Sequence, residues 1–100
     1  MLWLITRHIK PGNTESREPF LPKHREYLHS KKDILVLSGP LQDDGGTQSI
    51  GSVFIVDVNS RAEDKAFLDG DPFSSTGHYT DEKIIRMRKG VWNPAVAERT

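Results

Sequence analysis

Apolar residues gather in three short runs of the chain, each about as long as a β-strand. They span residues 2–9 (LWLITRHI), 34–41 (ILVLSGPL) and 50–58 (IGSVFIVDV). In the first and third runs both alternating sets of positions are largely apolar, which is typical of strands covered on both faces. A fourth strand, with one solvated face, is expected at about residues 82–89 (EKIIRMRK).

A helix is expected after the first strand and the turn residues 10–13 (KPGN) that end it. Pro22 suits the first turn of a helix, so we place the helix from about Pro22 to Lys31. Apolar residues at helical spacing then share one face: Phe20, Leu21, Tyr27 and Leu28.

A second, shorter helix is expected after the third strand. Ser60 and Glu63 have the spacing of a capping box, in which each side chain satisfies a free backbone N–H of the other. The helix would end near Gly70 and turn three residues inward: Ala62, Ala66 and Phe67.

The resulting order, β-α-β-β-α-β, predicts one α+β domain over residues 1–100 with the ferredoxin-like fold. A four-stranded antiparallel sheet would carry both helices on one face. Because the strands are apolar on both faces, we expect the same sheet of a second copy to cover the other face, giving a homodimer. The core should span about residues 2–92, with an irregular tail from Gly90 and Trp92 as its one anchor.

Composition narrows the choice of partners. Fourteen Lys and Arg balance fourteen Asp and Glu, and the basic stretch 83–89 reads better as a strand than as a phosphate track, so nucleic acid is not an expected partner. The chain has no cysteine, which excludes disulfides and thiolate chemistry. No apolar run has the length of a membrane span or the form of a signal peptide, so a cytoplasmic protein is expected.

His24 is the most informative candidate for chemistry. It falls at the centre of the apolar helix face, where an imidazole needs a hydrogen-bond partner. It is either a core histidine bonded to a backbone carbonyl or a general acid/base, since imidazole exchanges protons near neutral pH.

Asp71 follows the second helix and precedes Pro72, which is also a common way to start a turn. From there its carboxylate could reach His24 and fix the imidazole tautomer. Ser38-Gly39-Pro40 ends a strand, where a glycine lets a ligand approach the backbone and the Ser38 hydroxyl offers a hydrogen bond. No cofactor is expected, and no His pair has the spacing of a local metal site. A metal site assembled from distant residues, such as His8, His24 and Asp71, stays open.

Together these motifs resemble the YciI-like (YCII-related) family over nearly the whole chain. The resemblance rests on a central His in 22–28, on 37–41 (LSGPL), on 51–52 (GS) and on 71–73 (DPF) with Gly77 behind it. It implies a dimeric α+β barrel with His24 and Asp71 as the active-site pair. Ligand contacts would then come from five further residues: Ser38, Gly39, Pro40, Ser52 and Phe73.

The family resemblance also bears on the reaction. One relative removes HCl from a chlorinated hydroxyquinol, although most members have no established reaction. In this chain Pro19 and Pro22 crowd the start of the His24 helix, and 74–76 (SST) replaces bulkier apolar residues, which favours a more polar ligand. Two functions follow. One is a cofactor-free lyase or isomerase acting on a small cyclic or aromatic molecule; the other is a non-catalytic ligand-binding or accessory protein.

Overall fold

The computed structural model describes the backbone of residues 1–11 and 15–100, and the side chains outside residues 12–17. The turn expected at 10–13 therefore lies partly outside the described residues. The elements follow in the order β1 (Leu2–Ile9), η1 (Glu15–Phe20), α1 (Leu21–Ser30), β2 (Leu35–Gln42), β3 (Ser49–Asp57), α2 (Arg61–Gly70), η2 (Pro72–Ser75), β4 (Tyr79–Met87) and α3 (Pro94–Glu98).

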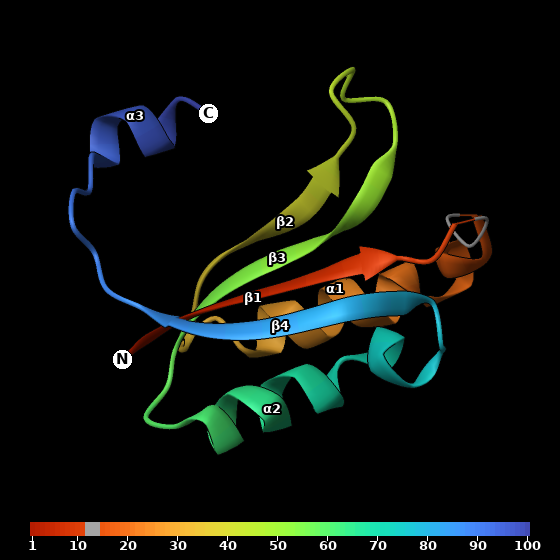
Figure 1. The fold of residues 1–100 in the computed structure, drawn as a ribbon, viewed down its shortest axis with the longest axis horizontal. Coiled ribbons are helices and arrows are strands. Elements are labelled where there is room, and N and C mark those ends of the chain that lie inside the picture. The colour runs from red at the N-terminus through yellow and green to blue at the C-terminus, as the bar shows by residue number, and fades with distance from the viewer. Residues whose placement is uncertain (12–14) are drawn as a thin grey trace.

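The four strands form one antiparallel sheet in the order β2-β3-β1-β4, with α1 and α2 on the same face (Figure 1). This arrangement confirms the ferredoxin-like fold. Alternate residues of the two central strands point to the helices and form the core with α2. The buried core residues are Trp3, Ile5, Phe54, Val56, Val58, Phe67 and Leu68.

Two prolines fit the start of the first helical region without breaking it. Pro19 lies in the short 3-10 helix η1, and Pro22 lies in the first turn of α1, where a backbone N–H has no helical partner. Tyr27 and Leu28 pack against the core as partly buried residues. The Tyr27 hydroxyl donates to the carbonyl of Phe67, 2.6 Å away, and so joins α1 to α2.

The cap of α2 is as predicted, whereas of the three predicted inward residues only Phe67 is buried. Ser60 Oγ accepts from the Glu63 N–H. The inward residues are Asp64, Phe67 and Leu68, whereas Ala62 and Ala66 are exposed. The pattern of apolar residues did not predict which side of α2 faces the core, because one of the three inward positions holds a carboxylate.

Asp64 is fully buried, and neither of its carboxylate oxygens has a hydrogen-bond partner among the described residues. Burial raises its pKa to about 6, against the opposing effect of the Arg61 charge. Such a group destabilises the folded protein when it ionises.

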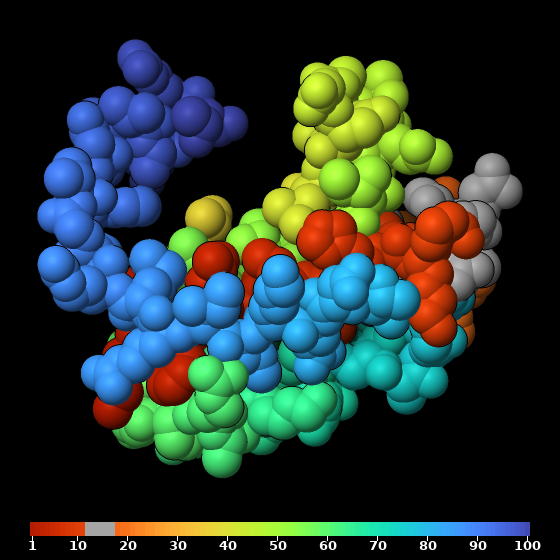
Figure 2. Space-filling view, in the orientation of Figure 1, coloured from red at the N-terminus to blue at the C-terminus, as the bar shows by residue number. Residues whose placement is uncertain are grey.

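Neither α1 nor α2 covers the other face of the sheet (Figure 1). Facing residues of successive strands form an apolar row across it, Leu37, Ile55, Leu4 and Ile85. Leu37 and Ile85 are each about half exposed, at 52% and 50%. Figure 2 shows this face hollowed between the β2–β3 turn (yellow-green) and the C-terminal segment (dark blue).

The C-terminal segment differs from the expected irregular tail. Residues 94–98 form the short helix α3, which begins because Asn93 Oδ1 accepts from the Val96 N–H and Pro94 suits the first turn. Trp92 is 56% exposed and so is not a buried anchor. Among the described residues, no helix is long and apolar enough to cross a membrane.

Candidate active site

His24, on α1, and Asp71, between α2 and η2, lie in contact with each other. His24 lies on the face of α1 that packs toward the sheet, and its side chain is 13% exposed. Its Nδ1 is 2.8 Å from Asp71 Oδ1. The predicted contact between these two residues is therefore present, and the bond to a backbone carbonyl is not what holds this imidazole.

Asp71 is held by the end of α2 and the start of η2. Its backbone N–H donates to Leu68, and its Oδ1 accepts from the Phe73 N–H at 3.1 Å. The carboxylate therefore caps a turn, as the simpler interpretation of the sequence expected, and also faces His24. A side chain held by its own backbone in this way has little freedom to move from the imidazole.

Arg7 is the site residue that the sequence analysis missed. It is fully buried on β1 and forms an ion pair with Asp71 Oδ2. Its Nη1 donates to Ser74 Oγ at 3.2 Å, and its guanidinium lies 4.1 Å from the centre of the Tyr79 ring. The sequence did contain a sign of this role. Arg7 follows Trp3 and Ile5 at alternate positions of the first strand and so should point to the same face, where a buried arginine requires an anionic partner.

The contacts with His24 and Arg7 decide the ionisation of Asp71. Burial alone would raise the pKa of this carboxyl. The hydrogen bond from His24, the charge of Arg7 and the Phe73 N–H outweigh burial and lower the pKa below its ordinary value. An ionised carboxylate only accepts hydrogen bonds, so the proton in the contact with His24 lies on Nδ1. With its Nδ1 proton directed at Asp71, the other ring nitrogen, Nε2, is the atom left to exchange a proton with a ligand.

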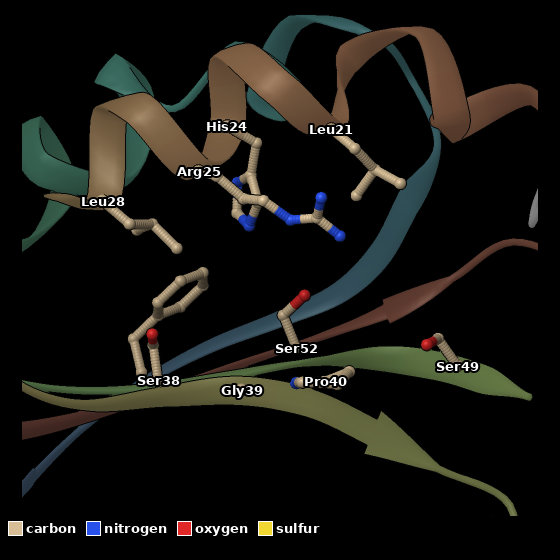
Figure 3. Close-up of a pocket in the computed structure, with 10 residues that line it drawn as sticks. Leu21, His24, Arg25, Leu28, Ser38, Gly39, Pro40, Ser49 and Ser52 are labelled. Atoms are coloured by element: carbon tan, nitrogen blue, oxygen red, sulfur yellow. The ribbon is translucent and has the colours of Figure 1, made fainter.

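A pocket of about 310 Å³ lies beside His24, between α1 and strands β2 and β3 (Figure 3). Four predicted ligand contacts line it: Ser38, Gly39, Pro40 and Ser52. The other lining residues are Leu21, Arg25, Leu28, Ser49 and Phe54. The pocket thus combines apolar walls from the helix and Phe54 with hydroxyl groups on the strands.

Phe73 was expected to contact the ligand, but it is not among the residues that line this pocket. It is 1% exposed and its ring packs against His24, with 4.5 Å between ring centres. This packing limits the movement of the imidazole. Ser74 binds Arg7 and does not line the pocket either, so the pocket's polar groups come from the strands and α1 instead.

A metal site built from His8, His24 and Asp71 does not fit this arrangement. His8 follows Arg7 on β1 and points to the opposite face of the sheet. Within the described part of the chain, no three His, Cys, Asp or Glu residues are grouped as metal ligands.

A ferredoxin-like domain with a carboxylate–imidazole pair beside a pocket defines the class of this protein. Residues 1–88 match the model of the YCII-related domain, so the chain belongs to the YCII-related family. No protein with a curated description matches the chain.

Two solved structures are similar to the chain. One is a 5-chloro-2-hydroxyhydroquinone dehydrochlorinase (TftG) from Burkholderia phenoliruptrix AC1100, in complex with 2,5-dihydroxybenzoquinone. It is 29% identical, with a TM-score of 0.84 over 90% of this chain and 96% of that one. An antibiotic biosynthesis monooxygenase, 21% identical over 89% of this chain and 98% of the other with a TM-score of 0.53, shares the fold.

Proposed function

We propose that this protein is a cofactor-free acid/base enzyme that catalyses an elimination or isomerisation on a small cyclic or aromatic molecule. One observation carries the proposal: His24 Nδ1 lies 2.8 Å from a buried carboxylate while the same ring borders a pocket. This is the arrangement in which a carboxylate orients an imidazole base and stabilises the imidazolium that it becomes.

In the proposed reaction His24 Nε2 removes a proton from the bound substrate. The electron pair of the broken bond to hydrogen forms a new π bond. In an elimination, the leaving group departs with the pair of its own bond; in an isomerisation, His24 returns the proton to another carbon. Asp71 holds Nδ1–H throughout, and Arg7 keeps Asp71 ionised.

The dehydrochlorinase relative supports an elimination on a ring. It binds a dihydroxybenzoquinone and shares 29% of its residues with this chain across nearly the full fold. The pocket beside His24 has an apolar wall, from Leu21, Leu28 and Phe54, that suits such a ring, and the Ser38 and Ser52 hydroxyls can hold its oxygen atoms. Chlorinated and hydroxylated aromatics are therefore the first substrates to test.

The test measures chloride release or substrate absorbance with 5-chloro-2-hydroxyhydroquinone and related hydroxylated rings. Replacing a general base lowers turnover by about 10² to 10⁴-fold, so His24→Ala should lower kcat by that amount. His29→Ala is the matched control, because His29 lies five residues further along α1 and is exposed. Turnover by His24→Ala equal to that of the parent chain would contradict the proposal.

The same assay separates the enzyme from the non-catalytic alternative. A ligand-binding protein would bind ring compounds in the pocket and turn over none of them. Binding by both the parent chain and His24→Gln, with no product from either across the panel, would favour a binding or accessory role.

We also propose that the helix-free face of the sheet is the interface of a homodimer. The row formed by Leu37, Ile55, Leu4 and Ile85 is apolar and continuous across all four strands. A second copy of the same surface, related by a two-fold axis, would cover this row. The small size of the domain favours such sharing, because a 100-residue chain buries limited surface by itself.

A further inference from the structure

The pocket beside His24 contains one cation that the proposed proton transfer does not use. Arg25 follows His24 on α1, and both residues line the same pocket. Figure 3 shows the Arg25 side chain reaching from the helix into the space above Ser52. Its guanidinium therefore faces the volume in which a substrate of the proposed reaction would lie.

Among the residues whose side chains the structure describes, no anionic group neutralises Arg25 in the pocket. The ten lining residues include no aspartate or glutamate. Among the described residues Arg25 forms no ion pair, and Asp71, which lies behind His24, is occupied by Arg7, His24 and the Phe73 N–H. The pocket thus presents a positive charge to which none of the described residues supplies a counter-ion.

The strands opposite Arg25 supply hydroxyl groups. Ser38, Ser49 and Ser52 line the pocket, and no described residue forms a hydrogen bond with their hydroxyls. Each can donate to an oxygen atom of a ligand. A guanidinium together with several hydroxyl donors suits an oxyanion, because planar guanidinium binds carboxylates through two parallel hydrogen bonds.

We propose that Arg25 is a specificity-determining residue that selects ring compounds carrying an anionic oxygen, a carboxylate or a phenolate. The ring lies against the apolar wall of Leu21, Leu28 and Phe54, and the anionic oxygen lies between Arg25 and the serine hydroxyls. This assignment deepens the proposed function and rests on the same pocket. It names the charge of the substrate, which the His24–Asp71 pair leaves undefined.

The test compares binding of benzoate and benzamide, which have the same ring and differ in charge. Binding is followed by ¹H–¹⁵N NMR titration at pH 7, with the shifts mapped onto Ser38, Gly39 and Ser52. The parent chain should bind benzoate about fivefold more tightly than benzamide, and added salt should weaken only benzoate. In Arg25→Gln the two affinities should become equal.

Lys23→Gln is the matched control, since it removes the same charge from the same helix at an exposed position that does not line this pocket. It should keep the preference for benzoate. The proposal is overturned if neither ligand shifts the pocket resonances, if the parent chain shows no preference, or if Arg25→Gln retains it. These readouts need no turnover, so a loss of the proposed catalytic role of His24 would leave the binding result interpretable, and the reverse also holds.

Discussion

Asp64 should make the protein less stable as the pH rises through the range from about 4 to 6. In the unfolded chain this carboxyl has the ordinary pKa of 3.8, and in the folded protein burial raises it to about 6. Between these values the folded state binds a proton that the unfolded state has lost, so the free energy of unfolding falls with rising pH. The difference of about two pKa units corresponds to about 3 kcal/mol, all of it lost above about pH 6.

Asp64→Asn removes the ionisation while keeping the size and shape of the side chain. The variant should match the parent chain below about pH 4 and exceed its unfolding free energy by up to about 3 kcal/mol at pH 8. Urea unfolding followed by the fluorescence of buried Trp3, at one fixed protein concentration, measures both values.

Asp69→Asn is the control for Asp64→Asn. Asp69 lies on the same helix, is 58% exposed and pairs with Lys65 at 3.0 Å. Its loss should change stability by less than about 1 kcal/mol at either pH. A stability difference between Asp64→Asn and the parent chain that stays constant from pH 4 to pH 8 would refute the reasoning.

Three further substitutions test other contacts. Arg7→Leu leaves the buried Asp71 without its guanidinium and should lower the urea-unfolding free energy by about 3–5 kcal/mol; a loss below 1 kcal/mol would count against the ion pair. Gly51→Ala places a Cβ against the backbone carbonyl of Arg7, so the melting temperature should drop, whereas Gly39→Ala, with open space around it, should leave it nearly unchanged. Leu37→Glu puts a charge into the apolar row and should convert a dimer to a monomer in sedimentation equilibrium; a parent chain that is already monomeric at micromolar concentration contradicts the dimer.

The fold followed from the sequence because its signals are local and repeated. The first strand was placed at its observed bounds, and the capping residues of α2 marked its start. What failed involved single polar side chains in apolar surroundings. Arg7 and Asp64 occupy inward positions that an apolar pattern alone assigns to other residues, and only the three-dimensional packing shows which way each one points.

The site was predictable in part for a similar reason. The position of His24 on its helix and the motif around Asp71 bring the pair together, and the strand motif places Ser38 and Ser52 on the pocket wall. Phe73 is buried against His24, whereas Arg25, an exposed residue of α1 that the sequence analysis did not single out, lines the pocket. Sequence spacing does not show that the Phe73 ring turns inward behind His24, or that Arg25 bends from an exposed helix position toward the strands.

The site joins two halves of the chain that are far apart in sequence. His24 comes from the first half of the chain and Asp71 from the second. Arg7, on the central strand β1, contacts Asp71 although 64 positions separate the two residues in the sequence. Long-range contacts of this kind form only once the intervening chain is ordered. A fragment ending after β2, or one beginning at β3, carries half of the constellation and no competent pocket. Recovery of ligand binding on mixing two such fragments would therefore report reassembly of the whole sheet, which makes the site an internal indicator of completed folding.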